Sequence, residues 1–201
     1  MLSSHTSTWT RAGAWLFKQR TWLPIPLAII LLSVRSGEAA SRSLIAVGTL
    51  LVMAAEMLRL SAVRQIGVIS RTRSDRLGPL MSNGPFGVVR NPLYLGNIGL
   101  WVGFAVAARL LWLVPVFLAI LGFEYHAIVR WEEDALERRF GDEYRAYAAR
   151  VPRWIPSFRS ERRRVDPARY SWRDTLFSER GTLIAIAVGY LLIWLKSQRP
   201  F

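Results

Sequence analysis

Two short groups of polar residues border apolar stretches of this sequence, and both could do chemistry. The first is Arg90-Asn91, followed at once by Pro92, where an apolar run begins. The second is the pair Glu132-Glu133, just after another apolar run ends. An arginine can hold a carboxylate through two parallel hydrogen bonds, and a glutamate can accept hydrogen bonds from an ammonium or from hydroxyls. Together the two groups could bind a small molecule that carries both a carboxylate and an ammonium.

Each of these residues also has a simpler interpretation. An arginine at the mouth of an apolar segment is often an anchor that extends toward the membrane surface. Two glutamates at the start of a polar helix often interact with the helix dipole or face solvent. The pattern around each group has to decide between these interpretations.

The elements that position the two groups are predicted to be membrane helices. The chain has 201 residues, of which 52% are hydrophobic, and it still carries a net charge of +13. A nucleic-acid-binding protein could carry this charge, but its apolar residues would not be gathered into long runs, so we expect no nucleic-acid partner. The fold class predicted is all-α, an integral-membrane bundle of about five transmembrane helices with membrane lipids around it. The apolar runs cover residues 22–34, 44–60, 93–108, 110–129 and 182–195.

The distribution of basic residues predicts the orientation of this bundle. With five crossings, 22 of the 27 Lys and Arg residues fall on the side of the N-terminus. Since cytosolic loops are enriched in Lys and Arg, we predict a cytosolic N-terminus in a multi-pass protein of a bacterial inner membrane or an equivalent membrane. Almost no loop remains at residues 109–110, so the third and fourth helices form a tight hairpin. The 84–97 stretch and the segment after Arg130 are therefore predicted to meet at the cytosolic surface.

The chain is predicted to be a single membrane domain. The expected parts are an interfacial helix (1–21), four transmembrane helices (22–129), a cytosolic segment (130–156), a basic cytosolic linker (157–181) and a fifth transmembrane helix (182–195). The first twenty residues lack the cleavage pattern of a secretory signal. There is no cysteine, which excludes disulfides, thiolate metal sites and cysteine nucleophiles.

The two polar groups belong to longer patterns. "GPFGVVRNPLYLGN" spans residues 84–97, and "EEDALERRFGDEYRAYAARVPRWIP" spans residues 132–156. Together they resemble the isoprenylcysteine carboxyl methyltransferase and phospholipid methyltransferase superfamily, whose members are small integral-membrane enzymes that use S-adenosylmethionine. The matching residues are Gly84, Pro85, Phe86, Arg90, Pro92, Tyr94, Gly96, Glu132, Glu133, Leu136, Phe140, Gly141, Tyr144, Tyr147 and Pro152.

The resemblance implies an enzyme that transfers a methyl group from S-adenosylmethionine to a lipophilic small-molecule or prenylated acceptor. In this interpretation Arg90 holds the cofactor carboxylate, and Glu132 or Glu133 takes the ammonium or the ribose hydroxyls. The cofactor-binding residues implied are Arg90, Asn91, Pro92, Tyr94, Gly96, Glu132, Glu133 and Tyr144. Cytosolic cofactor would reach in among the helices where Asn91-Pro92 interrupts regular structure.

Arg90, Asn91 and His126 are the candidates for catalytic residues. Asn91 departs from the family pattern, which usually has histidine there; asparagine can still donate and accept hydrogen bonds but does not titrate. His126 is an ionisable residue near the end of an apolar run, where such residues are often functional. The two histidines, His5 and His126, are far apart without a cluster of further ligands, so no metal site is predicted.

Other polar or small residues in the apolar runs have structural interpretations. Glu56 could pair with Arg59 or Arg64, and Glu124 with a neighbouring arginine. Gly96, Gly99 and Gly103 favour close packing of helices, and Gly96 could also leave room for the cofactor. The basic loop 70–78 is either an anchor at the cytosolic face or a binding site for an anionic head group.

Two other functions are compatible with the sequence. Membrane sterol reductases have a similar Arg-His-Pro pattern, so hydride transfer from NADPH is an alternative. A membrane scaffold or small transporter is the non-catalytic alternative. Transporters usually place their polar groups near the midplane, whereas most of the polar groups here gather at one interface, which favours an enzyme.

Overall fold

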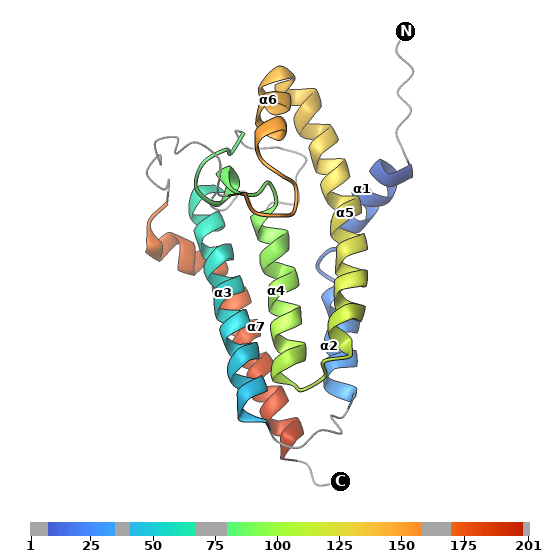
Figure 1. Ribbon diagram of the computed structural model, residues 1–201, viewed down its shortest axis with the longest axis vertical. Coiled ribbons are helices and arrows are strands. Elements are labelled where there is room, and N and C mark those ends of the chain that lie inside the picture. Colours follow the sequence, from blue (N-terminus) through green and yellow to red (C-terminus); the bar gives the residue numbers. More distant parts are fainter. Residues whose placement is uncertain (1–7, 35–40, 67–79, 158–169, 199–201) are drawn as a thin grey trace.

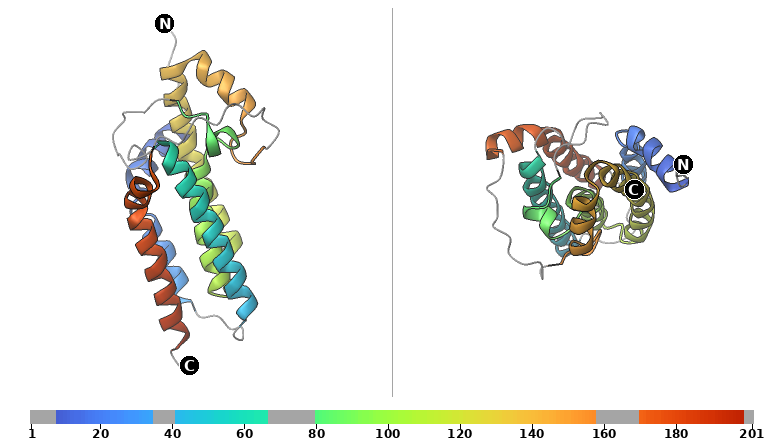
Figure 2. Two further views of the ribbon diagram at one scale, coloured as in Figure 1. Left: turned by 90° about the vertical axis from the view of Figure 1, so that its left-hand side faces the viewer. Right: turned by 90° about the horizontal axis from the view of Figure 1, so that it is seen from above.

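The computed structural model of the protein describes residues 8–34, 41–66, 80–157 and 170–198. This part of the chain is all-helical and contains no β-strand. The long helices run side by side as a bundle, and α6 lies at one end of it (Figures 1 and 2). The predicted all-α bundle is confirmed. Its helices are α1 (Thr8–Gln19), α2 (Pro24–Ser33), α3 (Arg42–Ile66), α4 (Pro92–Ala107), α5 (Leu113–Phe140), α6 (Asp142–Arg150) and α7 (Trp172–Ser197), with a short 3-10 helix η2 (Gly84–Gly87) before α4.

Three of the described helices, α3, α5 and α7, are long and apolar enough to cross a membrane. Helix α2 has 10 residues and α4 has 16, fewer than the ~20 that a crossing usually needs. Each of the five predicted apolar segments overlaps one of these helices. Five complete crossings and a cytosolic N-terminus remain predictions.

Helices α3 and α4 pack backbone against backbone. A Cβ atom added at Gly48 would lie 2.4 Å from the Ala107 nitrogen, and one at Gly103 would lie 2.7 Å from Val52 Cγ2. Only a glycine allows helices to approach this closely. The predicted packing role is confirmed for Gly103, and also for Gly99, where an added Cβ would lie 2.8 Å from Ala55 Cβ.

A short turn joins α4 to α5 and confirms the predicted hairpin. It occupies residues 108–112, slightly more than the two residues expected. The Leu110 amide donates to the Ala105 carbonyl over 2.8 Å, and Arg109 has a positive φ of 61°. The two helices therefore run antiparallel, and α5, with 28 residues against 16 in α4, passes the level where α4 begins and continues beyond it (Figure 1).

Gly141 separates α5 from α6. Its φ is 52°, a value that favours glycine, and its amide donates to the Glu137 carbonyl over 2.8 Å. Helix α6 starts at the next residue and turns back over the bundle. Tyr144 and Tyr147 are buried on its inner face, against residues of the α5 end and of the loop before α4.

The predicted linker 157–181 is wrong at its C-terminal end. Helix α7 begins at Trp172, ten residues before the apolar run starts at residue 182. The Ser171 hydroxyl caps it by accepting a hydrogen bond from the Asp174 amide over 3.1 Å, which satisfies one of the free donors of the first turn. Residues 158–169 of the linker and the basic loop 70–78 lie outside the described residues.

Helix α1 falls within the predicted segment 1–21 and packs on α5. A Cβ atom at Gly13 would lie 2.1 Å from the Ala127 carbonyl oxygen, so the two backbones touch. The rings of Phe17 and Trp131 are 4.8 Å apart at their centroids. The helix itself is confirmed, while its location at a membrane interface stays a prediction.

Candidate functional site

The two sequence patterns meet at the end of the bundle where α6 lies. The Arg90 amide donates to the Pro152 carbonyl over 2.9 Å, and the Ser157 amide donates to the Val88 carbonyl over 3.0 Å. The Tyr147 hydroxyl donates to the Phe86 carbonyl over 2.8 Å. The stretch before α4 and the stretch after α6 therefore form one unit, which confirms the predicted encounter.

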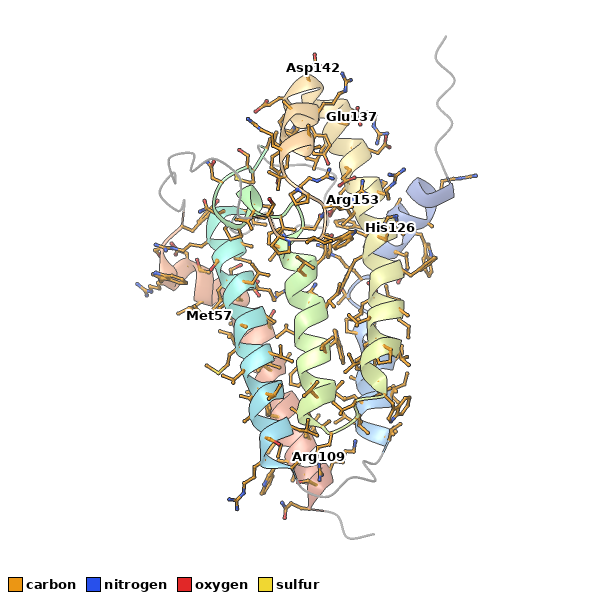
Figure 3. All side chains as sticks on the ribbon, in the orientation of Figure 1. Met57, Arg109, His126, Glu137, Asp142 and Arg153 are labelled. Carbon is orange, nitrogen blue, oxygen red and sulfur yellow. The ribbon has the colours of Figure 1, made fainter. Side chains whose placement is uncertain are left out.

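An ion cluster of Arg90, Glu133 and Arg153 lies in this unit. Arg90 Nη1 is 3.0 Å from Glu133 Oε1, and Arg153 donates from Nη2 to Glu133 Oε2 over 2.6 Å and from Nε to Oε1 over 2.9 Å. The side chains of Arg90 and Glu133 are each only 14% exposed. With two guanidiniums and one carboxylate, the cluster carries one excess positive charge. Arg153 lies at the end of the bundle opposite Arg109 (Figure 3).

One donor of this cluster has no partner. The Nε atom of Arg90 is buried and forms no hydrogen bond with any residue that the structure describes. An unsatisfied buried donor costs about 1 to 3 kcal/mol, and more when the group is charged. A positively charged site with such a donor is suited to an anionic ligand.

Tyr144 and Asn91 line the cluster. The Nη1 atom of Arg90 donates to the Tyr144 hydroxyl over 3.3 Å, and the Asn91 side-chain amide donates to the Arg153 carbonyl over 3.1 Å. Burial, followed by the negative charge of Glu133, raises the pKa of Tyr144 to about 12, so its hydroxyl stays protonated at neutral pH. The hydrogen bond to Glu133 raises the pKa of Arg153, which keeps that side chain charged.

A second polar pair, Tyr94 and Glu132, lies beside the ion cluster. The Tyr94 hydroxyl donates to Glu132 Oε1 over 2.8 Å, and its ring lies 4.8 Å from the ring of Tyr125. Consecutive glutamates on a helix point in different directions, so Glu132 and Glu133 have different partners. Glu132 and Glu133, which were equivalent candidates in the sequence, therefore have separate environments.

The remaining predicted site residues lie in different places. Pro92 is buried at the first turn of α4, where its missing N–H is tolerated. Gly96 faces α3, because a Cβ atom there would lie 2.4 Å from Arg59 Cγ. His126 precedes Glu133 by seven residues on α5, about 10 Å along the helix axis. The structure thus groups Arg90, Asn91, Glu133 and Tyr144, places Tyr94 with Glu132 beside them, and leaves the roles of Gly96 and His126 as predictions.

Sequence analysis missed Arg153 as a site residue. The available signal was its position directly after Val151-Pro152, where a helix must end beside the predicted site. It also left open the partner of Glu56, which is Arg59: Nε of Arg59 lies 3.2 Å from Glu56 Oε2.

Comparison with known proteins identifies the family to which the chain belongs. Residues 43–143, half of the chain, match the family described as phospholipid methyltransferase. The chain belongs to this family. The matching segment runs from α3 to the first residues of α6, so it contains Arg90 and Glu133, whereas Tyr144 and Arg153 follow it and α7 lies well beyond it.

Among curated proteins, the nickel-cobalt-cadmium resistance protein NccN of Alcaligenes xylosoxydans xylosoxydans is 28% identical over 146 residues. The alignment covers 68% of this chain and 65% of NccN. This chain therefore spans less than two thirds of the length of NccN. No solved structure matches the chain. In the described ranges, no group of three or more His, Cys, Asp or Glu side chains could hold a metal ion.

Proposed function

We propose that the protein is an S-adenosylmethionine-dependent methyltransferase that acts on a lipophilic acceptor in the membrane. Membership of the phospholipid methyltransferase family supports a membrane methyltransferase. The cofactor, the acceptor and the residue roles rest on the site itself. The buried, unpartnered Nε of Arg90 is the observation that carries the proposal.

The ion cluster fits the amino-acid part of S-adenosylmethionine. That part has one carboxylate and one ammonium, and the cluster has two guanidiniums for the carboxylate and one carboxylate for the ammonium. Arg90 would use its free Nε together with a terminal nitrogen, which is the two-pronged geometry that guanidiniums prefer with carboxylates. Glu133 would then exchange part of its contact with Arg90 and Arg153 for the ammonium.

When bound, the cofactor supplies a methyl group on a positively charged sulfur, which an acceptor can attack in line. The protein mainly has to align the two reactants and exclude competing water. Tyr144 and Asn91 hold the two arginines in place, through the Arg90 side chain and the Arg153 carbonyl respectively. This positioning role needs a hydrogen-bond donor but no titratable group, and an asparagine supplies the donor where the family usually has histidine.

The acceptor would approach from the bilayer. The outer faces of α3 and α7 expose large apolar side chains such as Leu50, Met57 and Phe177, which suits lipid contact on these sides. A carboxylate or phosphate acceptor would need no base, whereas an amine or hydroxyl would have to lose a proton. Glu132, hydrogen-bonded to Tyr94, is the carboxylate beside the ion cluster that could take such a proton.

Calorimetric titration of the detergent-solubilised protein with S-adenosylmethionine, and separately with NADPH, tests this proposal. We expect S-adenosylmethionine to bind and Arg90→Ala to lose binding. Arg145→Ala is the matched control, because Arg145 of α6 is 61% exposed and, among the residues that the structure describes, forms ion pairs with Glu137 and Asp142 at the surface. Binding of NADPH alone, or equal affinity in Arg90→Ala and the parent, would refute the proposal.

A further inference from the structure

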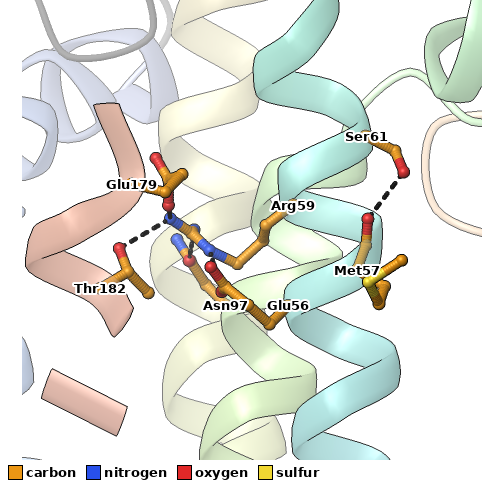
Figure 4. A network of polar contacts seen from close by, with 7 residues as sticks. All are labelled: Glu56, Met57, Arg59, Ser61, Asn97, Glu179 and Thr182. Atoms are coloured by element: carbon orange, nitrogen blue, oxygen red, sulfur yellow. Dashed lines mark hydrogen bonds and ion pairs between the residues drawn. The ribbon is translucent and has the colours of Figure 1, made fainter. Parts of the chain in front are cut away.

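A second buried ion cluster lies deeper in the bundle and is not used by the proposed reaction (Figure 4). Its centre is Arg59 of α3. The guanidinium contacts Glu56 Oε2 at 3.2 Å and Glu179 Oε2 at 2.5 Å, and it donates to Thr182 Oγ1 over 3.2 Å. It also donates to the side-chain oxygen Oδ1 of Asn97. One arginine therefore joins α3, α4 and α7.

This cluster is almost completely shielded from solvent. The side chain of Arg59 is 11% exposed, and that of Glu179 is 2% exposed. Buried ion pairs are costly to assemble, and loss of one partner leaves an uncompensated charge. Ionisable residues inside a membrane bundle are therefore rarely kept unless they serve a function or fix an arrangement.

Gly96 makes room for the Arg59 side chain. A Cβ atom at residue 96 would lie 2.4 Å from Arg59 Cγ and 3.1 Å from Arg59 Cδ. The arginine stem thus passes over α4 where this glycine leaves a gap, and its head group reaches Asn97 and α7 beyond. Gly96 belongs to the pattern around Arg90, and in the structure it admits a side chain of α3.

Asn97 connects this cluster to the candidate site. The side chain of Asn97 lies close to that of Tyr125 on α5. The ring of Tyr125 packs at 4.8 Å against the ring of Tyr94, whose hydroxyl donates to Glu132. Continuous contacts therefore lead from Arg59 to the Tyr94–Glu132 pair.

We propose that Arg59 is a positioning residue for the candidate site: through Asn97 and Tyr125 it fixes the Tyr94–Glu132 pair, and through Glu179 it makes helix α7 part of the same unit. Helix α7 lies outside the segment that defines the family, so the site of this chain depends on an element that the family match does not include. This inference rests on the proposed function in one respect, because its affinity test requires that the site binds S-adenosylmethionine.

Arg64 provides a matched control for attachment of α7 alone. Its Nε donates to the Tyr170 carbonyl over 3.2 Å, and its guanidinium lies 4.4 Å from the centre of the Trp172 ring. Arg64 thus also ties α3 to the start of α7, but its contacts do not include Asn97 or Tyr125. A residue that merely attaches α7 and a residue that positions the site can therefore be distinguished.

The first experiment measures the affinity for S-adenosylmethionine by calorimetry. We expect Arg59→Ala to weaken binding about tenfold, the factor for loss of one good hydrogen bond. Gly96→Ala should weaken it by a similar factor, and the double variant no further, because both changes displace the same side chain. Arg64→Ala should stay within about twofold of the parent. Parent-like affinity in Arg59→Ala, or equal weakening in Arg64→Ala, would overturn the inference.

The second experiment does not depend on the cofactor. Since the chain has no cysteine, spin labels can be attached at single cysteines replacing Met57 on α3 and Phe177 on α7, which are 56% and 67% exposed. We expect a narrow distance distribution in the parent and a broader one in Arg59→Ala. If the parent binds no S-adenosylmethionine, the proposed function fails and the labels alone decide. An unchanged distribution would then overturn the role of Arg59.

Discussion

Replacing Glu133 by glutamine should destabilise the protein measurably. Glu133 lies between two guanidiniums, 3.0 Å from Arg90 and 2.6 Å from Arg153. Glutamine keeps the volume of the side chain and one acceptor oxygen, but it removes the charge and turns an NH₂ group toward one of the arginines. The two guanidiniums would then repel each other without a carboxylate between them.

The magnitude follows from burial. Removing one partner of a fully buried ion pair costs about 3 to 5 kcal/mol, whereas an exposed pair is worth at most about 1 kcal/mol. The side chains of Glu133 and Arg153 are 14% and 27% exposed, so we expect an intermediate loss of about 2 kcal/mol. For a chain of this size, that loss lowers the unfolding midpoint by about 4 to 8 °C.

The assay is thermal unfolding in detergent, without added cofactor, beside the control Glu143→Gln. Glu143 is an exposed carboxylate on α6, so its replacement removes the same charge without disturbing the ion cluster. We expect the control to unfold within about 1 °C of the parent, as is usual for surface substitutions. An equal midpoint for Glu133→Gln and Glu143→Gln would show that the cluster does not stabilise the fold as argued.

Three further predictions concern packing, the departure from the family pattern and pH. Gly103→Leu should separate α3 from α4 and abolish stable folding in detergent. Gly122→Leu should fold, because nothing lies within 4 Å of a Cβ atom at Gly122. Size-exclusion chromatography distinguishes the folded variant from the unfolded one. Asn91→His should keep S-adenosylmethionine affinity within about threefold in calorimetry, since an imidazole N–H can replace the donor to the Arg153 carbonyl. The pKa of Tyr144 is raised from 10.0 to about 12 in the folded protein. As the pH rises through this range, the Tyr144 hydroxyl loses its proton in the unfolded state first, so the free energy of unfolding falls. Tyr144→Phe should lessen that fall in unfolding measurements at pH 10 to 12.

Much of the architecture could be predicted because it depends on local patterns. Apolar runs predicted the helices, and the nearly absent loop around Arg109 predicted the hairpin. Once the hairpin is assumed, the encounter of Arg90 with Glu133 follows from helix lengths alone.

The start of α7 was missed because its first ten residues include Arg173, Asp174, Glu179 and Arg180 and therefore form no apolar run. The apolar run begins at residue 182, whereas the helix begins at Trp172. The pattern Ser-x-x-Asp at Ser171 and Asp174 is a helix-start signal that does not depend on hydrophobicity, and the structure shows the corresponding hydrogen bond. The capping residues Ser171 and Asp174 therefore indicate the start of α7, which hydropathy does not.

Arg153 and Arg59 could not be assigned from the sequence because their partners are set by tertiary structure. Glu133 and Arg153 are 20 residues apart with α6 between them, and Arg59 and Glu179 are 120 residues apart. The path of the chain after α6, and the rotation of α3 and α7 about their axes, decide which side chains meet. Residue spacing and hydrophobic periodicity determine neither the path of the chain after α6 nor the rotation of these helices.

Gly96 shows how far a matched pattern can be interpreted. Its presence in the pattern around Arg90 placed it among the cofactor-binding candidates, and an added Cβ would collide with Arg59, a residue 37 positions earlier on another helix. A glycine in a pattern establishes only that something must approach closely. Whether that is a ligand, a backbone or a side chain depends on the neighbouring helix. At Gly99 and Gly103 it is α3 packing directly against α4, and at Gly96 it is the stem of an arginine. If Gly96 serves the cofactor, it does so through Arg59, so Gly96→Ala should have no effect on affinity once Arg59 has been replaced by alanine.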